Sequence, residues 1–325
     1  MKMTLLIPTY RRPNDLLRCL SAIEKQDRLP EEIIVIVRDT DTETQEALKE
    51  TFKQLPDSLS TSPVHKISLE YGTCLKVVTV YTHGVVAALN AGLEQASGDI
   101  LTVTDDDTVP HSPWLHRIEQ HFLNAPNVGG VGGRDWLYFG DVLQTGEKAS
   151  VGRLRWFGAR TGNHHLGVGK ARSVEILKGA NMSFRREAIG VRKFDERFKG
   201  TGAQVHFEMA FSLVIKKAGW TLIYDPEVSI DHLSGPRFDE DQRHQFNALA
   251  FTNAVHNETL ALLDYFSLFN QVFFWIWAIL VGNRKAFGLI QLIRFLPSEG
   301  TLACQKWLLS LSGRWQGYRT WLQHS

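Results

Sequence analysis

Leu101-Thr102-Val103-Thr104-Asp105-Asp106-Asp107-Thr108-Val109-Pro110 ends a β-branched run with three adjacent carboxylates. These carboxylates would repel one another at the end of a packed strand unless a positive charge lay beside them. Asp105 and Asp107 alternate along the chain, and oxygen ligands of this kind suit Mg²⁺ or Mn²⁺ with positions left open for a substrate phosphate. The alternative is a solvated acidic turn, the ordinary role of a run of like charges.

Strands and helices alternate on the N-terminal side of this stretch. Apolar β-branched runs predict buried parallel strands at residues 5–7, 32–37, 75–80 and 100–104. Apolar residues at helical spacing predict the intervening helices at residues 14–23, 42–52 and 85–95, the first capped by Asn14 or Asp15. Residues 55–65 are rich in Pro, Ser and Thr, so we expect a surface loop there. The pattern predicts an open α/β sheet, mostly parallel, in which ligands bind beyond the carboxyl ends of the strands.

The C-terminal side of the stretch is less regular. Pro113 opens a predicted helix, the glycine-rich residues 128–133 predict a strand that other backbone or a ligand approaches closely, and residues 135–178 show only loops and hairpins. Adjacent His164 and His165 lie in that region, but neighbouring side chains point apart in a regular element, so a metal pair is not expected. Further strands are predicted at residues 179–184, 221–224 and 228–230, and a helix at residues 206–218.

Composition excludes several classes of protein. The 325 residues are 43% hydrophobic and 22% charged, which is ordinary for a globular chain. A net charge of +1 argues against general nucleic-acid binding, which relies on clustered basic residues. Three widely spaced cysteines indicate neither a disulfide framework nor a zinc site, and the short apolar N-terminus is not expected to be a signal peptide. We therefore expect a cytoplasmic protein.

Several motifs together resemble glycosyltransferase family 2, the inverting nucleotide-sugar enzymes of the GT-A fold. They occur in the family's order over residues 3–233: residues 7–13 (Ile-Pro-Thr-Tyr-Arg-Arg-Pro), 37–39, 84–92, 105–107, 179–182, 194–198 and 208–219. The resemblance implies a GT-A domain at residues 1–233, with a donor half at 1–110 and an acceptor half at 111–233. It also implies transfer of a sugar, by default from a UDP-sugar, to a hydroxyl of a glycan or lipid-linked acceptor in polysaccharide or glycoconjugate synthesis.

The same resemblance implies roles for individual residues. Mn²⁺ or Mg²⁺ would be held by Asp105, Asp107 and His232, and Glu208 would be the general base, although the family often has aspartate at that position. Leu89 stands where an arginine is common, and Asp39 is a single acid where the family often has two. Donor-nucleotide contacts are expected from Pro8, Thr9, Tyr10, Arg11, Asp39, Asn90, Asp105 and Asp106. Acceptor or sugar contacts are expected from Gly179, Ala180, Asn181 and His206.

Two other functions remain open at this point. Asp105-Asp106-Asp107-Thr108-Val109 also matches the D-x-D-x-[TV] nucleophile loop of phosphohydrolases, but that loop should follow the first strand. A catalytically silent sugar-nucleotide-binding module would need the metal but not the base. A nucleotidyltransferase is disfavoured, because Pro8-Thr9-Tyr10 stands where a glycine-rich loop would be.

Residues 234–325 lie outside the resemblance and are predicted to form helices. Residues 265–281 carry no charge, residues 286–296 predict a second apolar helix, and basic residues outnumber acidic ones beyond residue 281. The first segment is short for a membrane span and contains Asn270 and Gln271. We expect residues 265–296 either to lie on the inner face of the cell membrane or to pack on protein. The sequence predicts no oligomeric state.

Overall fold

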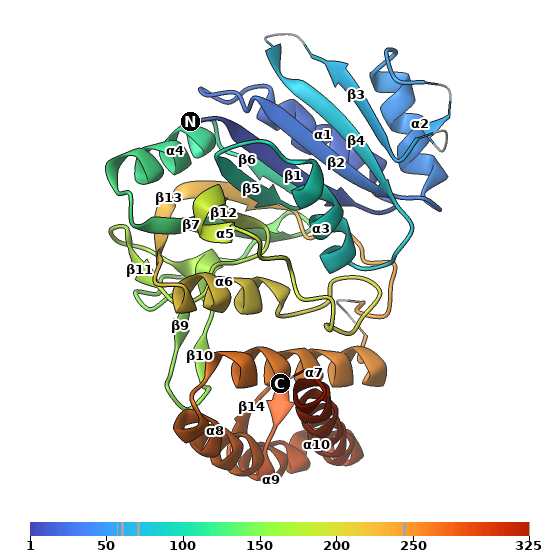
Figure 1. Cartoon of the computed structure of the whole chain (residues 1–325). Helices are drawn as coiled ribbons and strands as arrows, with labels where there is room; N and C mark the ends of the chain where they lie inside the picture. Colours follow the sequence, from blue (N-terminus) through green and yellow to red (C-terminus); the bar gives the residue numbers. More distant parts are fainter. Residues whose placement is uncertain (57, 60–61, 70–71, 243–244, 325) are drawn as a thin grey trace.

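One large mixed sheet organises the protein (Figure 1). The computed structural model describes residues 1–56, 58–59, 62–69, 72–242 and 245–324. The strand order is β11-β13-β7-β12-β5-β1-β2-β4-β3, with β6 beside β13 and β8 beside β7. Helices cover both faces of the sheet, so the predicted α/β architecture is confirmed.

The parallel part of the sheet comes from the N-terminal half. Its central strand, β1 (Met3–Thr9), runs parallel to both β2 (Glu32–Arg38) and β5 (Ile100–Thr104), and β2 runs parallel to β4 (Cys74–Val80). Almost every residue of β1, β2 and β5 is buried, as expected for strands that are covered on both faces. The connecting helices are α1 (Pro13–Ile23), α2 (Thr42–Thr51) and α3 (Val85–Gln95). All of these strands therefore end at one edge of the sheet.

Two local predictions in this half were wrong. Helix α1 begins at Pro13, with Arg12 as its N-cap residue, and neither Asn14 nor Asp15 caps it. Proline is favoured at the first helical position because its missing N–H has no intrahelical partner there in any case. Residues 64 and 65, predicted as loop, begin the edge strand β3 (Val64–Ser68), which pairs antiparallel with β4.

The second half adds antiparallel strands to the sheet. Strand β12 (Asn181–Arg185) lies antiparallel between β5 and β7 (Val128–Phe139), and β13 is one bulged strand, Thr221–His232, where two were predicted. A Cβ on Gly133 would lie 1.7 Å from the carbonyl oxygen of Val228, which explains the glycine-rich run. The other elements are β6 (Thr108–Pro110), α4 (Trp114–Asn124), β8 (Val142–Leu143), β9 (Arg153–Leu154), β10 (Arg160–Thr161), η3 (His164–Leu166), β11 (Arg172–Val174), α5 (Arg186–Ile189) and α6 (Phe207–Lys217).

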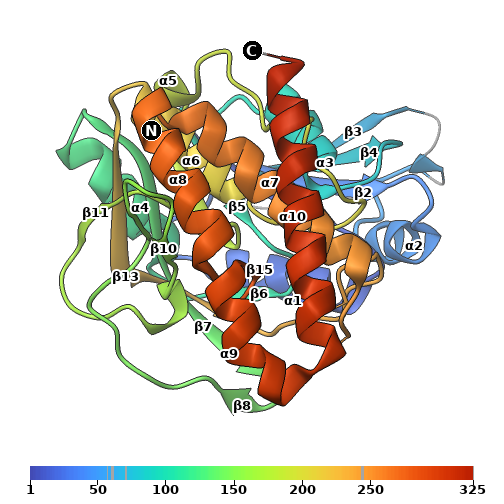
Figure 2. The same cartoon turned by 90° about the horizontal axis from the view of Figure 1, so that it is seen from below.

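The C-terminal region forms a helical layer below the sheet (Figures 1 and 2). Its elements are α7 (Ala248–Tyr265), α8 (Leu268–Leu280), β14 (Gly282–Asn283), β15 (Ala286–Phe287), α9 (Leu289–Glu299) and α10 (Thr301–Leu322). The helix predicted at residues 286–296 was therefore placed too early, because a short hairpin precedes α9. None of the helices in the described ranges combines the length and the hydropathy that a membrane span requires.

A buried ion pair joins two strands of the parallel sheet. Lys76 Nζ lies 2.5 Å from Glu32 Oε1, and both side chains are less than one-tenth exposed. Burial favours the neutral acid, but Lys76, Thr4 and Ser97 outweigh it and lower the pKa of Glu32 to about 2. A carboxyl group whose pKa is lowered in the folded state stabilises the protein above its unfolded pKa and loses that contribution as the pH falls.

We predict that Glu32→Gln lowers the free energy of unfolding at pH 7 by about 3 kcal/mol, because it leaves Lys76 buried without its counter-charge. The difference from the parent should shrink as the pH falls from about 4.5 towards 2. Urea unfolding across this pH range measures it, with Glu50→Gln on the exposed side of α2 as control. A difference that does not depend on pH would contradict the prediction.

Candidate active site

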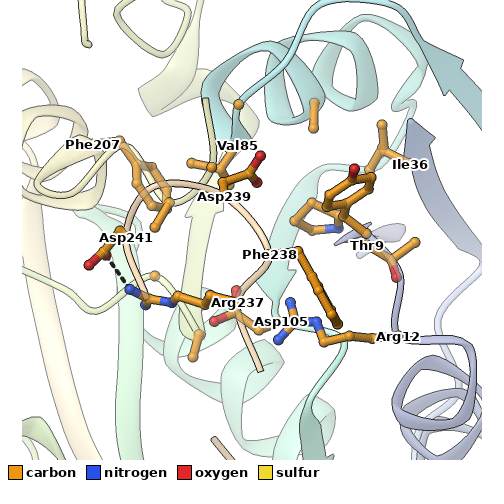
Figure 3. Close-up of a pocket in the computed structure, with 18 of the residues that line it drawn as sticks. Thr9, Arg12, Ile36, Val85, Asp105, Phe207, Arg237, Phe238, Asp239 and Asp241 are labelled. Carbon is orange, nitrogen blue, oxygen red and sulfur yellow. Dashed lines mark hydrogen bonds and ion pairs between the residues drawn. The ribbon is translucent and has the colours of Figure 1, made fainter. Parts of the chain in front are cut away.

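A cavity of about 250 Å³ opens at the carboxyl edge of the parallel strands (Figure 3). Its walls come from the ends of β1, β2 and β4, the start of α3, the loop before β12, the start of α6, and residues 236–241. Asp105 and His232 lie at one end of the lining together with Glu208. The sheet topology thus gathers polar groups from distant parts of the chain, as expected for this edge of an α/β sheet.

Asp105, Asp107 and His232 form the candidate metal centre. Each offers one ligand atom, and the three atoms lie within 4.8 Å of one another. The ring nitrogens of His232 are buried and make no hydrogen bond of good geometry within the described residues. Buried nitrogens without such a partner, next to carboxylate oxygens, fit a divalent cation such as Mn²⁺. The residues present therefore suit the metal that the sequence predicts.

Arg12 supplies positive charge to this carboxylate cluster. Its guanidinium lies 2.5 Å from Asp106 Oδ1 and 2.9 Å from Asp107 Oδ2. The backbone N–H of Gly235 also donates to Asp107 Oδ2, at 2.8 Å. Burial, opposed by Arg12 and assisted by Asp107, raises the pKa of Asp106 to about 7. A fully buried carboxyl group here is stable only because cationic and N–H groups surround it.

His232 connects the metal cluster to a second buried acid. Its Nε2 lies 3.3 Å from Asp107 Oδ1, and its Nδ1 lies 3.6 Å from Asp135 Oδ2. Burial favours the neutral imidazole, but Asp107 and Asp135 outweigh it and raise the pKa of His232 to about 9. Lys178 forms an ion pair with Asp135. Asp135 thus lies where an acid orients the ring of a ligand histidine.

Glu208 lies in the first turn of α6, at the same end of the cavity as Asp105 and His232. His206, two residues before Glu208, has a left-handed backbone (φ 81°) and is the N-cap residue of the helix. Burial raises the pKa of Glu208, whereas the nearby charges of Arg160 and Lys178 lower it. A carboxylate with a raised pKa is a better proton acceptor, so this geometry suits a general base.

Aromatic and charged side chains form the other end of the cavity. The Arg38 guanidinium lies 3.7 Å from the ring centroid of Tyr10, and its Nη1 lies 3.2 Å from Asp239 Oδ1. Phe238 meets the Tyr10 ring edge-on at 6.3 Å between centroids. Figure 3 shows Phe238 and Asp239 reaching over the cavity from the segment that follows β13. This end offers aromatic rings and a guanidinium group against which a flat ring can stack.

The structure brings some of the predicted site residues to the cavity and leaves others away from it. Those that line it are Pro8, Thr9, Tyr10, Asp105, Gly179, Ala180, Glu208 and His232, with Asp106 and Asp107 directly behind. Arg11, Asp39, Asn90, Asn181 and His206 are not among the lining residues. Asn90 bonds the backbone of Phe194, Asn181 accepts a hydrogen bond from the Trp114 indole, and His206 bonds Arg160. Their predicted contacts with donor or acceptor stay predictions.

Residues that the sequence analysis did not assign also face the site. Arg12 and Arg38 each adjoin an assigned residue in sequence, and Lys178 precedes the assigned Gly179. Side chains alternate between the two faces of a strand, and this alternation along β2 could have placed Arg38 at the site. Asp135 and Asp239 lie in regions predicted as loop or left outside the resemblance, and nothing local in the sequence marks them.

Comparison with known proteins gives the family. The model of the family described as Glycosyl transferase family 2 matches residues 4–190, more than half of the chain. The chain belongs to glycosyltransferase family 2. Among curated members, glycosyltransferase AglE of Haloferax volcanii is 30% identical over 114 residues, and the uncharacterized glycosyltransferase YwdF of Bacillus subtilis is 36% identical over 107. The matched segments span 35% and 33% of this chain and about a third of each relative's length.

Solved structures show the same fold at low sequence identity. TarS (residues 1–349) of S. aureus, in complex with UDP-GlcNAc, has a TM-score of 0.61 at 14% identity and is matched over 98% of this chain and 83% of its own. The mannosyltransferase PcManGT of Pyrobaculum calidifontis, in complex with GDP-Man and Mn²⁺, has a TM-score of 0.53 at 15% identity, over 99% and 87%. These structures confirm the predicted GT-A fold class. The family match confirms the predicted enzyme class, a glycosyltransferase.

We predict that Asp107→Ala abolishes Mn²⁺ binding, because Asp107 is the most buried carboxylate of the ligand set and lies beside His232. Water-proton relaxation in Mn²⁺ titrations measures binding, and circular dichroism checks that the fold survives. Asp141→Ala, at an exposed turn, is the control. If Asp107→Ala binds Mn²⁺ like the parent, this metal centre is wrong.

Proposed function

We propose that the protein is a metal-dependent, inverting glycosyltransferase that moves a sugar from a nucleoside-diphosphate sugar to an acceptor hydroxyl. The observation that carries the proposal is that Asp105, His232 and Glu208 line one cavity, with Asp107 completing the candidate metal cluster behind it. Glycosyl transfer needs charge neutralisation at the leaving diphosphate and proton removal at the acceptor. The carboxylate and imidazole cluster offers the first of these functions, and Glu208 offers the second.

Asp105, Asp107 and His232 would hold Mn²⁺ or Mg²⁺, which acts as a Lewis acid on the diphosphate when bound. Arg12 balances the carboxylates from the sheet side, and Asp135 orients the His232 ring. Asp106 contacts Arg12, so its predicted contact with the donor nucleotide depends on Arg12 moving. Each of these residues thus contributes to placing one cation at the end of β5.

Glu208 would take the proton from the acceptor hydroxyl as that oxygen attacks the anomeric carbon. Attack opposite the leaving group inverts this carbon. Gly179, Ala180, Asn181 and His206 are proposed for the acceptor side because they precede or flank Glu208 and β12. Gly179 lets the chain pass close to α6: a Cβ there would lie 3.0 Å from Phe207 Cζ.

The nucleotide would lie at the Tyr10 and Arg38 end of the cavity, with Pro8 and Thr9 beneath it. We propose a UDP-sugar as donor; Arg11, Asp39 and Asn90 are further candidate contacts. The test is Mn²⁺-dependent thermal stabilisation of the protein by a panel of UDP-, GDP- and dTDP-sugars. A ligand at a hundred times its dissociation constant stabilises by about 2.7 kcal/mol, which such a test detects.

The two alternative functions require different features of the site. A phosphohydrolase loop should follow the first strand, whereas the aspartates follow β5, the fourth parallel strand along the chain, and the family is a glycosyltransferase family. A sugar-nucleotide-binding module without activity would keep the metal site and not need Glu208. We further propose a glycan or lipid-linked acceptor and a cytoplasmic location at the inner face of the membrane.

We predict that Glu208→Gln lowers kcat by roughly 10²- to 10⁴-fold, the usual contribution of a general base, with donor affinity nearly unchanged. Release of the nucleoside diphosphate, coupled to a colorimetric phosphatase assay, measures turnover, and thermal shift measures donor binding. Glu187→Gln on α5 is the matched control at an exposed position. Unchanged turnover would remove Glu208 from the mechanism, and Asp195 and Glu196 would be examined next.

A further inference from the structure

Helices α8 and α9 expose rows of large apolar side chains. Of the 23 large hydrophobic residues that are exposed in the described part of the chain, ten lie on these two helices, each between 42% and 75% exposed. They are Leu268, Phe269, Val272, Ile276, Ile279 and Leu280 on α8, and Leu289, Ile290, Ile293 and Leu296 on α9. The rows follow helical spacing, so each forms one face of its helix. Soluble proteins usually expose such side chains singly.

The two helices differ in how much of their surface is buried. Helix α8 already buries an inner face, with Phe274 and Ala278 in the main hydrophobic cluster and the Gln271 amide donating to the Leu263 carbonyl. Its outer row is a second apolar face that lies outside this cluster. Helix α9 has no buried residue at all. Figure 2, which looks up at the helical layer, shows α8, α9 and α10 together on this side of the molecule.

Basic and aromatic side chains border the apolar rows. The guanidinium groups of Arg284 and Arg294 lie 5.5 and 5.4 Å from the Phe295 ring centroid, and no described carboxylate pairs with either of them. Trp156, at the tip of the β9–β10 hairpin, is half exposed and packs against Phe273 of α8 at 4.8 Å between centroids. Arginine and tryptophan are the residues that gather where an apolar surface meets lipid headgroups.

We propose that the outer faces of α8 and α9, bordered by Arg284, Arg294 and Trp156, dock on an anionic lipid bilayer, with both helices lying in the interface. Glu299 is the only acidic residue from position 265 to the end of the chain, and Lys306 binds it at 2.6 Å. A second copy of the chain on this surface would bring one basic patch against another, because a two-fold interface pairs a patch with itself. An anionic bilayer instead matches both the charge and the apolar rows.

The docking surface also adjoins the acceptor side of the cavity. The β14–β15 hairpin joins α8 to α9 and carries Lys285, which lies near enough to Glu208 and Asp241 to be influenced by their charges. A bilayer under α8 and α9 would thus present the hydroxyl of a lipid-linked acceptor from the Glu208 side. This link to the acceptor, unlike the docking itself, rests on the proposed function.

Flotation of the full-length protein with vesicles tests the docking. With roughly 7:3 phosphatidylcholine to phosphatidylglycerol, the protein should float at low salt, and about tenfold less should float with phosphatidylcholine alone or at high salt. Ile276→Asp with Ile293→Asp, and separately Arg284→Glu with Arg294→Glu, should each reduce the floated fraction about tenfold. Val142→Asp with Val191→Asp changes two exposed apolar residues elsewhere and should float like the parent.

Three results would overturn the inference: no flotation of the parent, flotation of the Ile276 and Ile293 double variant at the parent's level, or a dimer in light scattering that this double variant dissociates. Mn²⁺-dependent donor stabilisation, measured on the same samples, keeps the two proposals apart. Failure to float with donor binding intact overturns the docking alone, whereas flotation without donor binding overturns the proposed function.

Discussion

Burial of the Asp106 and Asp107 carboxylates at the end of the central strand β5 is the constraint on which the site depends. Two adjacent acids that are almost fully buried cost several kcal/mol each unless cations or N–H donors compensate them. Compensation comes from Arg12 before α1, His232 at the end of β13, and the Gly235 backbone. These groups are far apart in sequence, so the acids are compensated only in the folded sheet. The same arrangement leaves an imidazole beside the carboxylates, which is a ligand set for a divalent cation.

The carboxylate cluster also positions the segment that covers the cavity. Gly235 is tied to Asp107, and a few residues later Phe238 meets Tyr10 and Asp239 pairs with Arg38. One short segment therefore contacts both the Asp107 end and the Tyr10 end of the cavity. Asp107 therefore binds both Arg12 and the backbone of Gly235 at the start of this segment.

Sequence predicted the parts of the fold that periodicity determines. The parallel strands, their order along the chain and the place of Asp105 followed from buried β-branched runs and the rule that ligands bind at strand ends. Tertiary context decided the rest. Arg38 and Asp39 are adjacent, but β2 continues through Arg38, so its side chain reaches Tyr10 while the Asp39 N–H bonds the Val80 carbonyl. Asn90 and Asn181 look like polar site residues in sequence, yet both satisfy buried backbone or indole groups.

The predicted domain boundary at residue 233 marks where the resemblance to the family ends. Side-chain packing in the core continues across it. Residues of α7 and α8, including Leu262 and Phe274, belong to the same hydrophobic cluster as Phe184 and Phe211. Buried Glu258 of α7 forms ion pairs with Arg160 of the β9–β10 hairpin and Arg314 of α10, and Arg160 in turn bonds His206 beside the start of α6. The helical layer is thus fixed to the element that carries Glu208. A surface on its outer side, α8 and α9, therefore has a defined orientation relative to Glu208, which a flexibly attached tail would not have.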